Sequence, residues 1–425
     1  MRISQRKLSY FAYVAIIWLG VFVPGHLGGF IVEQLYVAFV VFSTIALFAT
    51  CRTNSNYFEF NAKMIFAFFF VLEIFYVISY LHAEIRFPSE QGGFRDYVEL
   101  ARYLIYLTFA MLVLFYHPRN SLHLAESLVL ACIFYSIFVA FVYIAQIPIL
   151  SEFFEDFLYV ATRDDLSQIL SGGRVRFAAP FPNSNYLAYF LCMAIVILLF
   201  FATGFRRLIL FVICLLILFL TGSRTGWLTS LVILILWFLA HFKLAVFERR
   251  NFGNFFLLTF LSMAILGLIF SISLPSFSRL SELNSAISSG DLRSVASLSA
   301  RLDHSFYILN SLKESWIFGL GPAKYSLTTV IDNQYLLWIT RQGIIGLIII
   351  FIGIYLFFRR MIRAGDDTRD VFGILSFFAV IGLFGMTGAF LNNFRLLLIT
   401  LFFAAVIMDQ CQNNKNFHVL KRSNA

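Results

Sequence analysis

Residues 206–241 read RRLILFVICLLILFLTGSRTGWLTSLVILILWFLAH. Two almost uninterrupted apolar runs, 206–221 and 224–241, flank the tight turn Thr221-Gly222-Ser223-Arg224-Thr225-Gly226. A helix that crosses the hydrocarbon core of a bilayer needs about 20 mostly apolar residues, so each run is long enough for a short span. The stretch therefore predicts two transmembrane helices with an arginine in the turn between them.

The rest of the chain repeats this apolar pattern. Of its 425 residues, 60% are hydrophobic and 13% are charged, whereas soluble globular domains carry about 25% charged residues. The runs that qualify as spans are 10–24, 30–50, 63–82, 98–116, 124–147, 185–203, 206–221, 224–241, 253–273, 334–358, 371–390 and 393–409. We therefore expect an all-α polytopic membrane protein, with residues 1–425 forming a single transmembrane domain of about 12 helices.

The distribution of basic residues predicts the orientation. With the N-terminus inside, more than half of the 32 Lys and Arg residues fall in inner segments, including the dense run Arg359-Arg360-Met361-Ile362-Arg363. Inner loops of membrane proteins collect Lys and Arg, so we expect both termini in the cytoplasm.

The net charge of +9 then needs no nucleic-acid partner. The short stretch 1–7, which contains three basic residues, precedes the first apolar run, and no clear small-residue cleavage site follows that run. We therefore expect a retained first helix rather than a removed signal peptide.

Two long loops are expected on the outer face, at 150–184 and 274–333. The second loop is rich in Ser in its first half and has a helical pattern in its second half. Its apolar residues recur every three or four positions, which predicts an amphipathic helix ended by Gly319-Leu320-Gly321-Pro322. Such a helix could lie on the bilayer surface or cap a cavity. The expected apolar stripe consists of Leu302, Phe306, Leu309, Leu312 and Trp316.

Arginines on the outer side are the first candidates for chemistry. A guanidinium binds phosphate through paired hydrogen bonds and stays charged, so it suits a lipid-linked pyrophosphate. Ordinary solvated loop charges are the alternative interpretation. Arg224 differs because it lies between two apolar spans, where a charge is costly unless it is paired or wet. The outer arginines are Arg163, Arg174, Arg176, Arg224, Arg279, Arg293, Arg301 and Arg395.

Charged residues inside the predicted spans form a second group. Arg102 and Arg341 are either functional or lie near helix ends, from which their side chains reach the interface. Glu33 and Glu73 are either internal ion-pair partners or functional carboxylates. The sequence leaves both pairs of alternatives open.

The segment 332–336 (DNQYL) lies where the second long loop enters a helix. Asp332 and Asn333 could cap that helix, or Asp332 could act as a general base on a sugar hydroxyl. Two prolines and two asparagines in 180–185 predict a rigid turn at a helix start. The His and Cys residues are not spaced as metal ligands, and no phosphate-binding or dinucleotide motif is present, so we expect neither metal nor cofactor.

These pieces resemble the O-antigen ligase/polymerase family of bacterial membrane glycosyltransferases. The resemblance covers residues 170–350, and the order and spacing of its parts carry it. The parts are 176–188 (RFAAPFPNSNYLA), 220–228 (LTGSRTGWL), Arg301 with the helix before 319–322 (GLGP), and 332–336 (DNQYL) followed by Gly343 and Gly346.

The resemblance implies a GT-C-like, metal-independent glycosyltransferase in the bacterial cytoplasmic membrane. Its donor would be a polyprenyl-pyrophosphate-linked glycan, with Arg224 and Arg301 as catalytic residues at the pyrophosphate and Asp332 at the acceptor hydroxyl. The implied partners are this donor, a similar acceptor and the lipid bilayer, and a chain-length regulator protein is a further candidate. The implied substrate-binding residues are Arg174, Arg176, Asn183, Asn185, His304, Asn333 and Tyr335.

Asp332 also bears on which reaction is expected. Ligases of this family usually carry His at that position, and they transfer glycan to lipid A–core. The aspartate therefore favours a polymerase of repeat units, with the ligase as the alternative. A lipid-linked oligosaccharide flippase fits 12 spans, but it predicts charges near the midplane rather than at the outer edge. A sensor or scaffold would need no arginine cluster.

Overall fold

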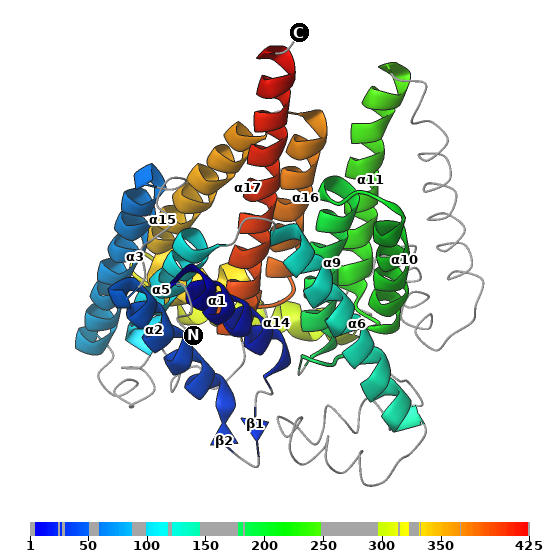
Figure 1. The fold of residues 1–425 in the computed structure, drawn as a ribbon. Coiled ribbons are helices and arrows are strands. Elements are labelled where there is room, and N and C mark those ends of the chain that lie inside the picture. The colour runs from blue at the N-terminus through cyan, green and yellow to red at the C-terminus, as the bar shows by residue number, and fades with distance from the viewer. Residues whose placement is uncertain are drawn as a thin grey trace.

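The computed structural model describes most of the chain. The described residues are 5–23, 26–27, 30–50, 59–86, 99–117, 121–144, 177–181, 183–247, 296–312, 315–322, 331, 333–365 and 367–423. Their helices, shown in Figure 1, are α1 (Gln5–Phe22), α2 (Val32–Thr50), α3 (Glu59–Arg86), α5 (Arg102–Tyr116), α6 (Ser121–Ile144), α9 (Ser184–Val196), η4 (Ile197–Phe201), α10 (Phe205–Leu220), α11 (Arg224–Phe247), α14 (Ala296–Ser311), α15 (Gln334–Ala364), α16 (Thr368–Gly385), η7 (Phe390–Asn392) and α17 (Phe394–Ser423).

One small hairpin interrupts this helical architecture. Strands β1 (His26–Leu27) and β2 (Phe30–Ile31) pair antiparallel between α1 and α2, with His26 opposite Ile31 and Leu27 opposite Phe30. The predicted all-α class is confirmed for the described residues apart from this pair of two-residue strands.

The helices follow the predicted apolar runs. Every run except 253–273 contains a helix, and 253–273 lies outside the described residues. The described part of the chain holds 7 helices long and apolar enough to cross a membrane. Residues 221–223 separate α10 from α11, so the two runs around Arg224 are two helices, as predicted. The chain is therefore a multi-pass membrane protein, while about 12 spans remains a prediction.

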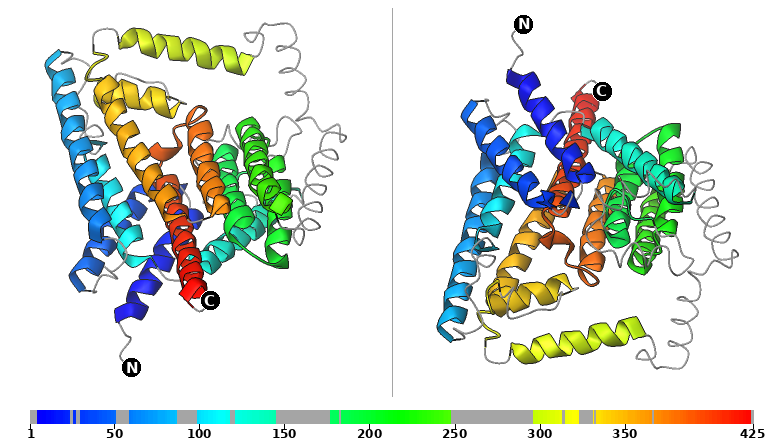
Figure 2. Two further views of the ribbon diagram at one scale, coloured as in Figure 1. Left: turned by 90° about the horizontal axis from the view of Figure 1, so that it is seen from above. Right: turned by 90° about the horizontal axis from the view of Figure 1, so that it is seen from below.

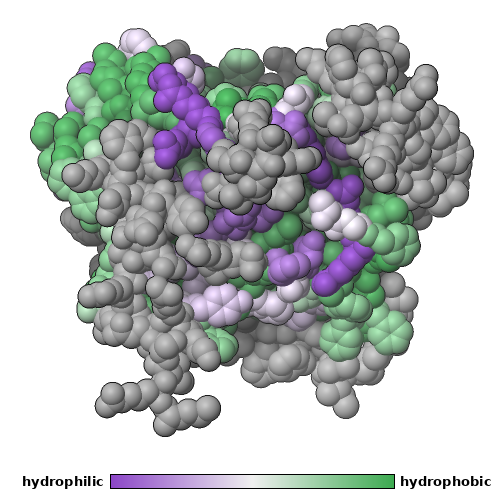
Figure 3. Space-filling model, turned by 45° about the horizontal axis from the view of Figure 1, so that its top comes forward, coloured by the Kyte–Doolittle hydropathy of each residue, from purple (hydrophilic) through white to green (hydrophobic). Residues whose placement is uncertain are grey.

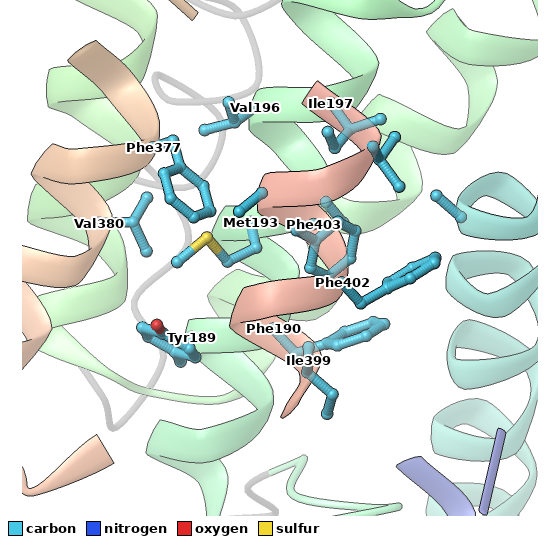
Figure 4. Packing of buried hydrophobic residues seen from close by; sticks show 14 of the residues in the cluster. Tyr189, Phe190, Met193, Val196, Ile197, Phe377, Val380, Ile399, Phe402 and Phe403 are labelled. Atoms are coloured by element: carbon cyan, nitrogen blue, oxygen red, sulfur yellow. The ribbon is translucent and has the colours of Figure 1, made fainter. Parts of the chain in front are cut away.

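Helices α9 and α17 lie at the centre of the bundle. Figure 1 shows α17 beside α16, with α9, α10 and α11 on one side and α2, α3 and α5 on the other. Figure 4 shows Phe190 and Met193 of α9, Phe377 and Val380 of α16, and Phe403 of α17 packed between the helices, and all five are buried. Lipid tails are as apolar as these side chains, so close van der Waals packing holds the helices together.

Basic side chains gather at the end of the bundle that lies at the top of Figure 1, where α15 and α17 end. Figure 3 tilts this end toward the viewer and shows hydrophilic residues on it and hydrophobic residues on the flanks. Arg207 and Arg369 both donate to the carbonyl of Ala202, directly after η4, so they cap the free carbonyls of that helix end. This basic end comprises Arg206, Arg207, Arg359, Arg360, Arg363 and Arg369.

Helices α5, α9, α11, α15 and α17 all begin at the other end of the bundle, which we call the opposite end. There α15 is broken at Gly343, whose φ of 62° is open mainly to glycine. The free carbonyls of Thr340 and Arg341 accept the N–H groups of Leu320 and Gly321. In return, the N–H of Ile344 donates to the carbonyl of Trp316. The turn 315–321 thus replaces the hydrogen bonds that α15 loses at its break.

Close backbone contact makes this break in α15, with its hydrogen bonds to the turn 315–321, dependent on glycine. A Cβ at Gly343 would overlap the carbonyl of Ile317, and a Cβ at Gly319 would overlap the backbone of Gly343. A Cβ at Gly321 would lie 2.9 Å from the Cα of Tyr80. The first segment of α15, residues 334–342, is therefore fixed to α3 and to the turn that follows α14.

Candidate functional site

The turn between α10 and α11 holds Arg224 at the opposite end. Gly222 has a φ of 63°, as expected of a glycine that ends a helix, and its N–H donates to the carbonyl of Phe219. Ser223 caps α11, because its Oγ accepts the N–H of Gly226 at 3.2 Å. Arg224 is then the first residue of α11, and its side chain is partly buried.

The predicted helix entry at 332–336 is also present. The Oδ1 of Asn333 accepts the N–H groups of Tyr335 at 2.9 Å and Leu336 at 3.1 Å, so Asn333 caps α15. The hydroxyl of Tyr335 donates to the carbonyl of Gly382 at 3.0 Å. Both side chains thus have structural contacts. Asp332 lies outside the described residues, but its two neighbours, Ile331 and Asn333, are described.

One short connector joins these two motifs. It consists of residues 386–387, which directly follow α16. The Oγ1 of Thr225 lies 2.9 Å from the Oγ1 of Thr387, and the Nδ2 of Asn333 donates to the carbonyl of Met386 at 3.2 Å. Arg224 and the position of Asp332 are therefore each one residue away from a contact with the same connector.

The first long loop meets the Arg224 turn from another direction. The N–H of Phe177 donates to the carbonyl of Leu220 at 3.1 Å. Phe177 directly follows Arg176, and Leu220 ends the helix before the turn. The backbone next to Arg176 is thereby fixed beside the turn that carries Arg224, although Arg174 and Arg176 lie outside the described residues.

Helix α14 runs alongside the first segment of α15 and extends beyond its start, as Figure 2 shows. Ile308 and Leu312 are buried in a small cluster with Leu336 and Leu337 of α15. Arg301 lies two helical turns before Ile308, which places both positions on the same side of α14. Ile308 is on the side of α14 that packs against α15.

The predicted apolar stripe of α14 is wrong in its details. Phe306 is 55% exposed and Leu309 is 45% exposed, and the buried residues are Ile308 and Leu312. The helix ends at Ser311, before Trp316 and well before 319–322. The reason is that a helix at a membrane edge has two surfaces that accept apolar residues, the protein core and the lipid, and periodicity does not distinguish them.

His304 lies on α14 between these residues and is partly buried. Among the described residues, its Nε2 is buried without a hydrogen-bond partner. A buried unsatisfied nitrogen is costly, so a polar partner at this position would stabilise it. This observation is compatible with the predicted substrate-binding role of His304.

Arg102 and Arg341 are buried in ion pairs with one carboxylate, that of Glu99. The Nε of Arg102 donates to the Oε2 of Glu99 at 2.5 Å, and the Nη1 of Arg341 lies 3.3 Å from the same oxygen. Arg102 also donates to the hydroxyl of Tyr106 at 2.8 Å, and its guanidinium lies 4.6 Å from the ring centroid of Phe394. Both arginines are therefore held by partners inside the protein, and Arg102 is the first residue of α5.

Two other predicted charges have structural partners. The Oε2 of Glu73 accepts the N–H of Tyr103 at 3.1 Å, so Glu73 caps the start of α5. Arg395 is 3% exposed and donates to the carbonyls of Gly20 and Val21 at the end of α1. Arg395 is thus neither a solvated loop charge nor free to bind a ligand.

The remaining predicted residues divide into described and undescribed ones. Asn183 caps α9, since its Oδ1 accepts the N–H of Asn185 at 2.8 Å, and both residues lie at the opposite end. Among the described residues, no three His, Cys, Asp or Glu side chains come together as metal ligands would. The residues whose positions or side chains are not described are Glu33, Arg163, Arg174, Arg176, Arg279, Arg293, Arg301 and Asp332.

Sequence reasoning missed Glu99 and the 386–387 connector. Glu99 stands three residues before Arg102, a helical spacing that allows an ion pair and that the sequence displays. The connector carries no such signal, because Thr225 and Thr387 are 162 positions apart.

The O-antigen ligase family matches residues 209–351 of the chain. The predicted family resemblance is confirmed. No curated protein matches the chain. The matched region begins within α10 and ends within α15, and it contains Arg224, Arg301 and Asp332. The family and the apolar helices together support a multi-pass bacterial membrane protein of polysaccharide biosynthesis, with lipid-linked glycans as the class of substrate.

Proposed function

We propose that this protein polymerises polyprenyl-pyrophosphate-linked oligosaccharide repeat units at the outer face of the bacterial cytoplasmic membrane. The observation that supports this most is the connector 386–387, which contacts the neighbours of both Arg224 and Asp332. In this proposal Asp332 is the base for the acceptor and Arg224 is the cation for the leaving group, each next in sequence to a residue that contacts the connector. The opposite end of the bundle would be the outer face.

Transfer would proceed by attack of an acceptor hydroxyl oxygen on the anomeric carbon of the donor glycan. The bond from that carbon to the pyrophosphate oxygen breaks, and the proton passes to the carboxylate of Asp332. Arg224 and Arg301, with Arg176, stabilise the negative charge that develops on the departing pyrophosphate. This arrangement requires no metal ion.

Helix termini at the same end support an anionic substrate. Arg224 is the first residue of α11, and Asn333 caps α15. The N-terminus of a helix carries a partial positive charge, so it favours anions. Three residues would keep the backbone around the site in place through their hydrogen bonds, namely Asn183, Asn333 and Tyr335. The residues that would contact the glycan or pyrophosphate are Arg174, Asn185 and His304.

A ligase is the second candidate, because the matching family is that of O-antigen ligases. Asp332, where ligases of this family usually carry His, favours the polymerase. In a ligase the same donor chemistry would end on lipid A–core rather than on another lipid-linked unit.

The glycan profile of a deletion strain distinguishes the two candidates. A polymerase predicts loss of long chains, with single repeat units still transferred to the final acceptor. Loss of single units from the acceptor as well would instead support the ligase. An unchanged profile would contradict both.

A further inference from the structure

A cluster of three buried charges lies at the opposite end, at the start of α5 and in the first segment of α15. We call Glu99, Arg102 and Arg341 the buried triad. Their side chains are 6%, 5% and 11% exposed. Both arginines bind the same carboxylate oxygen, so the triad joins the start of α5 to α15.

The two arginines of the buried triad have unequal roles. Arg102 binds Glu99 through Nε and Nη2, and its Nη1 also donates to the carbonyl of Asn392 at 2.6 Å. Glu99 and Arg102 thus form a neutral, well-bonded pair without Arg341. A second buried cation adds a desolvation cost, so Arg341 is not needed to balance charge in the fold.

Arg341 instead fixes one segment of backbone. It lies two residues before the break at Gly343, near the end of the first segment of α15. Its Nη1 donates to the Oδ1 of Asn392 in η7 at 3.2 Å. At the start of the same segment, the Oε1 of Gln334 accepts the N–H groups of Leu391 at 3.0 Å and Asn392 at 3.2 Å.

Both ends of this segment are therefore bound to the stretch between α16 and α17. The segment has a break at one end and follows Asp332 at the other, so it cannot rely on the rest of α15 for its position. The hydrogen bonds of Gln334 and Arg341 add to those from the turn 315–321 and fix that position from the other side. Gln342 adds a further bond, since its Nε2 donates to the hydroxyl of Tyr103 at 2.6 Å.

We propose that Arg341 is a positioning residue, which through Glu99 and Asn392 fixes the first segment of α15, the helix that begins two residues after Asp332. This inference rests on the proposed function, because it takes Asp332 as the base for glycosyl transfer. A displacement of about 1 Å in a reacting group can lower the rate about a hundredfold. Arg341 would therefore affect turnover without touching the substrate.

The test compares Arg341→Met with the wild-type protein, purified and supplied with lipid-linked repeat units. Arg341→Met leaves the neutral Glu99–Arg102 pair and fills the space with an adaptable apolar side chain. We expect an unchanged or higher thermal unfolding temperature and a kcat lower by about tenfold to a hundredfold. The KM should stay within about twofold, because no substrate contact is removed.

Two further variants separate positioning from folding. In Arg341 a single nitrogen reaches both Glu99 and Asn392, so Arg341→Lys can keep both contacts and should recover most of the lost kcat. Arg102→Met is the matched contrast, because it removes contacts to Glu99, Tyr106 and Asn392 and should lower thermal stability. A parallel loss of stability and kcat in Arg341→Met would overturn the proposal, as would a rise in KM at constant kcat.

Hydrogen exchange gives a readout that needs no substrate. The amides of Leu320, Gly321 and Ile344 bond across the break in α15, so they should exchange faster in Arg341→Met than in the wild type. Unchanged exchange together with unchanged kcat would exclude the positioning role. If the wild type extends no lipid-linked unit, the proposed function fails, and faster exchange would then support only the anchoring of the segment.

Discussion

Arginines in this chain serve at least two structural purposes that the sequence does not distinguish, since some share a carboxylate and others bind the carbonyls at a helix end. Arg102 and Arg341 share the carboxylate of Glu99, and Arg395 binds the carbonyls that end α1. Arg207 binds the carbonyl after η4. A charge near the membrane is costly, so the sequence predicts that each arginine has a partner. It does not predict which partner, because each one lies where two segments meet in the fold.

Arg224 lies at the start of α11, one residue from the contact between Thr225 and Thr387. We expect Arg224→Ala to lower glycan polymerisation by about 10²- to 10³-fold, because one prepositioned donor to developing negative charge has that effect. The measurement is the length distribution of surface glycans in a deletion strain carrying the variant at equal membrane levels.

Arg206→Ala is the matched control for this prediction. Arg206 is an exposed arginine at the basic end, so its loss should leave chain length unchanged. Normal long chains in the strain carrying Arg224→Ala would remove Arg224 from the site. Equal losses in both variants would point to a general effect on expression or insertion.

Elements of secondary structure were predicted well, and their breaks were not. The run 334–358 reads as one helix, yet α15 is broken at Gly343 by the turn 315–321. A glycine in an apolar run indicates that the helix can break there, but it does not predict that the helix does so. The break itself depends on hydrogen bonds from Leu320 and Gly321, which lie in another segment.

Replacement of Gly343 tests whether the break in α15 depends on glycine. Gly343→Ala should lower the stability of the purified protein by about 1–3 kcal/mol, because an alanine at positive φ is strained and its Cβ would overlap the carbonyl of Ile317. The measurement is thermal unfolding in detergent. Gly382→Ala is the control, since its Cβ would come no closer than 3.7 Å to another atom, the hydroxyl oxygen of Tyr335. Equal stability of the two variants would contradict this account of the break in α15.

For the molecule as a whole, composition alone established the class. The spacing of apolar runs predicted nearly all of the described helices, because a span must bury its own backbone hydrogen bonds and so needs a fixed length. The assembly of the site could not be predicted in the same way. It depends on contacts between distant residues, such as Thr225 with Thr387 and Asn333 with Met386.

The orientation of the bundle can be tested by labelling. Met386 is 60% exposed at the opposite end, and Arg363 is exposed at the basic end. In a variant without native cysteines, Met386→Cys should react with a thiol reagent that cannot cross the cytoplasmic membrane, in cells whose outer membrane has been permeabilised. Arg363→Cys should react only after the cytoplasmic membrane is opened. The reverse result would place the proposed site on the cytoplasmic side.

Extension of lipid-linked units by the purified protein tests the proposed reaction itself. The protein in lipid nanodiscs would receive polyprenyl-pyrophosphate-linked single units with no lipid A–core present. We predict a ladder of longer lipid-linked glycans, and we predict that Asp332→Asn slows its formation by about 10²- to 10⁴-fold through loss of the base. Failure to extend, extension only when lipid A–core is added, or an undiminished ladder with Asp332→Asn would contradict the account.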